Sequence, residues 1–84
     1  MTVNQIKFNI ELIQSARKEI ADLKKEKIIS RANAWEDATG TAKEKEDYVR
    51  SVVADIDKEI AYKEANIEYC YNMNKLLEKD LEDD

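Results

Sequence analysis

The sequence predicts an all-α protein, an antiparallel two-helix hairpin with coiled-coil-like packing. The chain has no proline, 39% of its residues are charged, and its apolar residues recur at helical spacing. Such a pattern is typical of long helices and coiled coils. One break, residues 34–41, holds the only glycine, Gly40, and the only tryptophan, Trp35. A single break predicts one domain over residues 1–84, with helices at about 3–38 and 42–81 and a hinge at about 39–41.

The first helix is predicted to start near Thr2, because Thr2 and Gln5 have the spacing of a capping box. Its apolar residues lie three or four positions apart, which places them on one face: Ile6, Ile10, Ile13, Ala16, Ile20 and Leu23. Near the break the apolar positions shift to Ile28, Ile29, Ala32 and Trp35. This shift predicts that the buried stripe rotates around the helix toward the hinge.

The hinge is predicted from a stop signal that is followed at once by a start signal. Gly40 is suited to the C′ position of a helix, since it adopts positive φ without a Cβ penalty. Thr41 and Glu44 form a second capping box. A connection this short makes the two helices antiparallel neighbours.

The second helix carries a more regular seam, whose positions alternate by three and four: Val49, Val53, Ile56, Ile60, Lys63, Ile67, Cys70, Asn74, Leu77 and Leu81. This is a period of about 3.5, the repeat of coiled coils. Lys63 is expected to extend its ammonium into water, and Asn74 to be solvated near the open end of the hairpin.

A second apolar stripe runs beside this seam, through Tyr62, Ala65, Tyr69, Met73 and Leu76, with Phe8 and Leu12 expected opposite it on the first helix. One seam cannot cover both stripes, and each large side chain left in water forgoes about 1.5–3 kcal/mol. We therefore predict association with a second copy or another protein in a four-helix arrangement. The predicted protein interface contains Trp35, Phe8, Leu12, Tyr62, Tyr69, Met73 and Leu76. The alternative is that the tyrosine rings cover the flank of a solitary hairpin and keep their hydroxyls wet.

Charge and hydropathy exclude several partner classes. The net charge of −5 argues against nucleic acid, which requires a concentrated basic face. No apolar run approaches the about 18 residues that a membrane-spanning helix needs, so no stable membrane insertion is expected. The first residues, Met1–Phe8, lack a secretory signal pattern. The predicted localisation is cytoplasmic, with any export independent of a cleavable signal peptide.

The sequence predicts no catalysis, no cofactor and no metal. Histidine, the commonest general base and zinc ligand, is absent. Cys70 falls on the apolar seam and is read as a small core residue. One glycine cannot build a glycine-rich phosphate loop.

Trp35 has two readings from the sequence. As a structural residue it would close the end of the core, packing on Ile28, Ile29, Tyr48 and Val52. As a functional residue it would stay partly exposed and serve as an aromatic anchor, the residue type most often found at binding hot spots.

The short acidic chain, its two long helices and Trp35 at the hinge with Gly40 soon after give a resemblance. The chain resembles the WXG (ESAT-like) family of bacterial type VII secretion, and also the small helical partners encoded beside LXG toxins. The resemblance implies hairpins that pair as homodimers or heterodimers and are exported or escort larger substrates. In that family the glycine follows the tryptophan by two residues, whereas Gly40 follows Trp35 by five. A tyrosine followed four residues later by an acid, the usual export motif, is absent after Tyr62, Tyr69 and Tyr71.

Three functions therefore stay open. The first is a non-enzymatic binding protein, a type VII secretion partner or targeting subunit or a secreted WXG-like protein, whose partner is itself, a second small hairpin or a larger helical toxin. The second is an acidic inhibitor or antitoxin-like binder, of the kind that phages encode, for a nuclease or other enzyme. The third is a generic coiled-coil adaptor.

Overall fold

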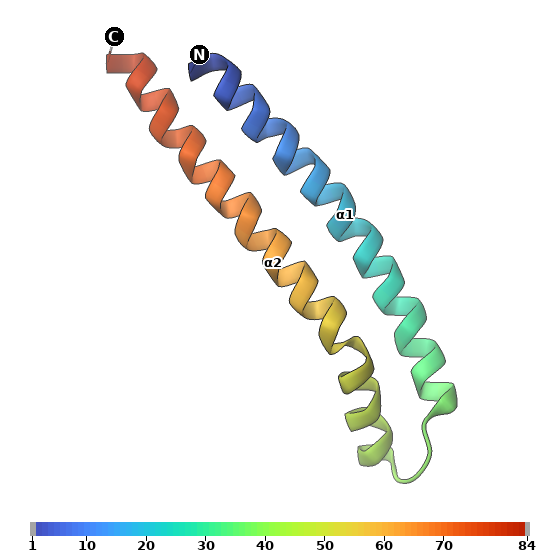
Figure 1. The fold of residues 1–84 in the computed structure, drawn as a ribbon. Coiled ribbons are helices and arrows are strands. Elements are labelled where there is room, and N and C mark those ends of the chain that lie inside the picture. The colour runs from blue at the N-terminus through green and yellow to red at the C-terminus, as the bar shows by residue number, and fades with distance from the viewer. Residues whose placement is uncertain (1, 84) are drawn as a thin grey trace.

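The computed structural model describes residues 2–83 and confirms the predicted all-α helical hairpin. Helix α1 spans Thr2–Asp37 and helix α2 spans Ala42–Asp83, with no strand among the described residues. The helices run antiparallel, so the start of α1 and the end of α2 lie at the same end of the rod (Figure 1). The Cα atoms span 65 × 17 × 12 Å, and a rod this thin has room for a single seam of buried side chains.

The seam of α1 differs from the prediction. Its least exposed residues follow a strict alternation of four and three positions along the helix: Ile6, Asn9, Ile13, Ala16, Ile20, Leu23, Lys27, Ser30 and Ala34. Ile10 lies outside this series and is 43% exposed, while Ile28 and Ile29 are more than 60% exposed. The predicted rotation of the stripe is therefore wrong. Near the hinge the seam consists of small or polar residues. The large apolar residues there, on which the prediction relied, lie outside the seam.

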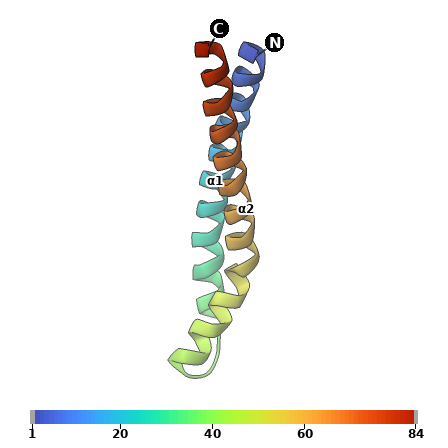
Figure 2. The same cartoon turned by 90° about the vertical axis from the view of Figure 1, so that its left-hand side faces the viewer.

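The seam of α2 follows the predicted positions from Val49 to Leu77, each of which is buried or half-buried. Leu81 is the exception, at 43% exposure. Leu81 lies at the end of the rod where α1 begins with the small residue Thr2. The 3.5-residue repeat makes two helices wind around each other, and the view turned by 90° shows them changing sides along the rod (Figure 2).

Polar contacts across the seam fix the register. Asn9 bonds to Asn74, Glu19 to Lys63, and Lys27 to Asp57. The residue numbers of these three pairs add up to 83, 82 and 84. A residue of α1 therefore faces the residue of α2 whose number brings the sum to about 83.

The two polar seam residues of α2 are more tightly held than the sequence suggested. Asn74 is buried, not solvated: its side chain accepts a 2.8 Å hydrogen bond from Asn9 Nδ2 and donates one of 3.3 Å to the Ile6 carbonyl. Gln5 in turn donates to Asn9 Oδ1. Lys63 is half-buried, and its ammonium donates to Glu19.

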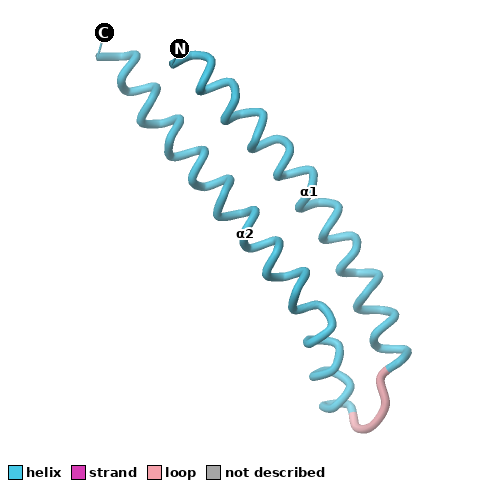
Figure 3. Tube along the Cα trace, viewed as in Figure 1, coloured by secondary structure: helices cyan, strands magenta, loops and turns pink. Residues whose placement is uncertain are grey.

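The hinge, residues 38–41, is the only loop between the two helices (Figure 3). The Ala38 amide still donates to the Ala34 carbonyl, and Ala38 is buried against the hairpin. Thr41 Oγ1 accepts from the Glu44 amide and donates to the Glu44 carboxylate, which confirms the capping contact at the start of α2. Gly40 has φ of +100° and lies three residues beyond the end of α1, so it shapes the reversal and is not the C′ residue of that helix.

Candidate functional site

Cys70 is buried at 8% exposure on the seam. Among the side chains that the structure describes, no three acidic or cysteine groups cluster closely enough to hold a metal ion. The candidate functional features are therefore surfaces, and these fall on two opposite sides of the seam.

The first surface, here called the tyrosine side, consists of residues that each precede a seam residue by one position: Phe8, Leu12, Tyr62, Tyr69, Met73 and Leu76. All six belong to the predicted interface. Met73 is half-buried, and the other five are 43% to 68% exposed. The structure thus gathers six of the seven predicted interface residues on one side of the rod.

Leu12 and Tyr69 lie on facing helices and line one groove of about 380 Å³, together with Ala16, Ile67 and Cys70. The groove also contains Glu19 and Lys63, whose ion pair crosses from α1 to α2. The glutamate raises the pKa of the Lys63 ammonium above its usual value, because it accepts the ammonium's hydrogen bond. The tyrosine side is therefore an apolar strip interrupted by a fixed charge pair.

A second apolar group lies on the same side at the hinge end, separated from the tyrosine side by four exposed acids that also precede seam residues by one position: Asp22, Glu26, Asp55 and Glu59. Ile29, Tyr48 and Val52 also precede seam residues by one position, and they are 62%, 46% and 39% exposed. From the sequence these three are expected to pack around Trp35, which the structure corrects. The side of Ile29 follows only when the seam is traced through Ser30, which carries no apolar signal, whereas Tyr48 and Val52 precede the predicted seam residues Val49 and Val53.

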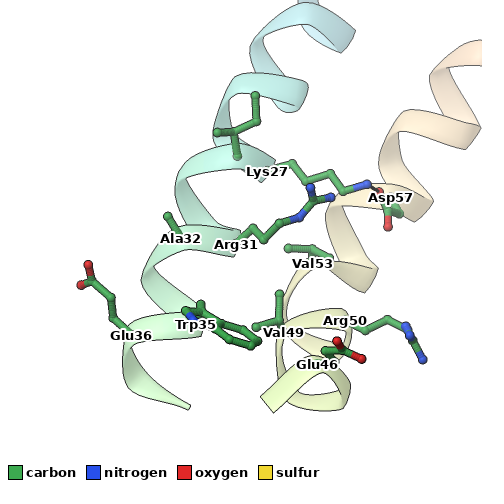
Figure 4. Close-up of a pocket in the computed structure, with 11 residues that line it drawn as sticks. Lys27, Arg31, Ala32, Trp35, Glu36, Glu46, Val49, Arg50, Val53 and Asp57 are labelled. Atoms are coloured by element: carbon green, nitrogen blue, oxygen red, sulfur yellow. Dashed lines mark ion pairs between the residues drawn. The ribbon is translucent and has the colours of Figure 1, made fainter. Parts of the chain in front are cut away.

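Trp35 lies on the other side of the seam. It lines a second groove at the hinge end. Three of the lining residues on α1 follow seam residues by one position: Ile28, Arg31 and Trp35. On α2 the groove is lined by Val49, Arg50 and Val53, among others. We call it the hinge groove; it encloses about 730 Å³ (Figure 4).

The indole of Trp35 does not close the end of the core. It is 47% exposed and reaches from α1 toward Val49 of α2 (Figure 4). The Lys45 ammonium lies 5.6 Å from the ring centroid, which is a cation–π contact. Trp35 is thus held against the hairpin on one face and open to the groove on the other. The structure does not bring it together with the tyrosine side.

Charges around the hinge groove are unequally paired. At the end away from the hinge, Lys27 forms an ion pair with Asp57 across the groove. Arg31 forms no ion pair with any described residue within 4 Å. Arg50 reaches only the exposed Asp47, at 3.7 Å. Arg31 therefore borders the apolar floor without a close carboxylate, and Arg50 has one exposed carboxylate partner.

The surface as a whole is large for the mass of the chain. A compact 9.8 kDa monomer exposes about 5,200 Å², whereas this hairpin exposes 6609 Å². The excess is larger than the about 800 Å² that each partner loses in a standard protein interface. Among the described residues no side chain falls below 2% exposure, so the seam alone completes no core.

No protein-family model, curated protein or solved structure matches this chain. Neither α1 nor α2 contains a stretch that is long and apolar enough to cross a bilayer.

Proposed function

We propose that this chain is a non-enzymatic binding protein that works by docking its tyrosine side on another helical protein. The observation that carries the proposal is the size of this side: five large apolar side chains are at least 43% exposed along one face of a rod with no complete core. Exposed apolar strips of this length mark interaction sites. A four-helix arrangement, formed with a second hairpin or a helical segment of a larger protein, would cover the strip.

Within this proposal, the resemblance to the WXG family favours a role in type VII secretion, as a partner or targeting subunit for a larger helical toxin. The support is the outline of the chain: two long helices, a four-residue hinge and a half-exposed tryptophan beside it. Export would then depend on a signal in the partner.

A second candidate function, the acidic inhibitor, has one observation in its favour. The excess negative charge resides in α2, which has 12 acidic and 7 basic residues, while α1 has 6 and 7. A helix with this excess of acidic residues would be attracted to the basic cleft of a nuclease. Lysines interrupt the acidic residues along α2, however, which weakens the field that such a mimic needs.

The deciding experiment is affinity purification of the tagged protein from its native cells, in parallel with two variants. Tyr69 and Tyr71 are two positions apart and 66% and 52% exposed, but Tyr71 follows the seam residue Cys70 and lies on the other side. We expect Tyr69→Glu to lose the co-purifying protein and Tyr71→Glu to keep it. Recovery of a helical toxin or second hairpin supports the secretion proposal. Recovery of a basic nuclease would instead support the inhibitor function, provided that neutralising the carboxylates of α2 abolishes its co-purification.

A further inference from the structure

The hinge groove lies on the opposite side of the seam from the proposed interface, so covering the tyrosine side leaves it open. We propose that the hinge groove is a second docking site, which takes one amphipathic helix of a partner protein with carboxylates beside its apolar stripe. The proposal goes beyond the function above, because it makes the hairpin a bridge between two partners.

The dimensions of the groove fit one short helix. Its lining runs from Lys27 to Glu36 on α1 and from Glu46 to Asp57 on α2. At 1.5 Å per residue these stretches are about 15 Å long, or about three helical turns. The Lys27–Asp57 ion pair bridges the helices at the inner end. A second copy of the hairpin would present helices of 36 and 42 residues, which overrun a groove of this length.

The floor and walls of the groove suit helix packing. Val49 and Val53 are small, buried side chains at its base. Ile28 and Trp35 are seven residues apart, 65% and 47% exposed, and form the wall on α1. Because these two side chains are two helical turns apart, they leave space between them for apolar side chains at i and i+3 or i+4 of a docked helix.

The charges specify the polar flanks of that helix. Arg31 extends from α1 toward α2 above Val53, whereas Arg50 on α2 points away from α1 (Figure 4). Carboxylates on the flank of a docked helix would pair with the Arg31 guanidinium. Arginine forms directed, bidentate pairs with carboxylates, which gives such a contact specificity. Glu36 and Glu46 lie at the hinge end of the groove, where the positive N-terminal end of the docked helix is favoured.

Two synthetic three-turn helical peptides test the proposal. Both carry leucines at i, i+3, i+4 and i+7, lack tryptophan and are cross-linked to stay helical; one has glutamates beside the leucines and the other lysines. Trp35 is the only tryptophan of the chain, so its emission reports on the groove alone. We expect the glutamate peptide to bind and to shift this emission to shorter wavelength. The lysine peptide should bind at least about tenfold more weakly.

Variants locate the site. Arg31→Glu should weaken the glutamate peptide at least about tenfold and strengthen the lysine peptide. Tyr69→Glu, on the other side of the seam, should leave both affinities unchanged, which separates this site from the tyrosine side. Circular dichroism confirms that each variant stays helical. The proposal is overturned if neither peptide binds, if Arg31→Glu changes nothing, or if raising the protein concentration alone buries Trp35, which would assign the groove to a second copy.

Discussion

Asn9 of α1 and Asn74 of α2, 65 positions apart, share a 2.8 Å hydrogen bond inside an otherwise apolar part of the seam. Both are buried, at 5% and 7% exposure, and every buried side-chain polar atom of the described residues has a hydrogen-bond partner. A paired amide at a seam position stabilises less than a leucine pair would, but it is satisfied in only one alignment. This contact therefore selects the register of the hairpin.

Replacement of one member should be costly. Asn74→Leu leaves the buried Asn9 amide without its main partner, so we expect the free energy of unfolding to fall by about 1–3 kcal/mol. The double variant Asn9→Leu/Asn74→Leu should recover this loss or exceed the parent, because both polar groups are gone. Urea unfolding of the four proteins of this cycle measures the coupling. Additive effects of the two changes would show that the hydrogen bond does not hold the register.

Gly40 should not tolerate a side chain. Its φ of +100° disfavours any L-residue, and a Cβ atom there would lie 2.6 Å from Glu44 Oε2. We expect Gly40→Ala to lower the free energy of unfolding by about 1 kcal/mol or more. Thr39→Ala in the same loop is the matched control. A neutral Gly40→Ala would mean that the hairpin is able to reopen into a continuous helix at little cost.

Trp35 should contribute little to stability. Since the indole is 47% exposed, truncation removes only part of the burial that a core tryptophan provides. We expect Trp35→Ala to lower the free energy of unfolding by about 1–1.5 kcal/mol, well short of the about 3–5 kcal/mol typical of core positions. Thermal and urea unfolding measure this. A loss in the core range would place the ring inside the seam in solution.

Lys63 should make the stability of the hairpin depend on alkaline pH. The hydrogen bond that the Lys63 ammonium donates to Glu19 raises the pKa of Lys63 in the folded state above the unfolded value of 10.5. A raised lysine pKa stabilises the fold fully below the unfolded pKa, and this contribution disappears as pH rises through the folded pKa. Unfolding curves from pH 9 upward should therefore show a steeper decline for the parent than for Glu19→Gln. Equal slopes would contradict a persistent pair.

The sequence was sufficient for the hairpin because one glycine-containing break between two periodic stretches allows few other folds. It was also sufficient for the seam of α2, where large apolar residues mark nearly every position. The seam of α1 was misplaced wherever Asn9, Lys27 or Ser30 occupies it, since each is polar. Asn9 and Lys27 are held there by partners on α2, and Ser30 is a small residue. The register comes from those cross-helix pairs, and no periodicity within one helix reports them.

The grouping of the predicted interface residues on one side of the rod is right for six of them and wrong for Trp35, and both outcomes have the same reason. Residues such as Phe8 and Tyr69 sit one position before the seam on both helices, so an offset stripe on α2 correctly identified its counterpart on α1. Trp35 was grouped with them because it is large and aromatic. One residue is 100° of helix, and this single step places Trp35 after the seam and on the opposite side. The hinge groove needed the fold, since its floor combines two helices that only the register aligns.

The adjacency of the two helix ends has a mechanical consequence. A force that pulls apart the start of α1 and the end of α2 acts perpendicular to the seam. It therefore separates the helices one seam layer after another, beginning at that end. The Asn9–Asn74 layer lies near that end and would open among the first, and the loop at Gly40 would open last. Layers that break in turn resist a much smaller force than layers loaded together. A thin hairpin of this kind can thus be stable in solution and still unfold under a small force when the chain is pulled from this end.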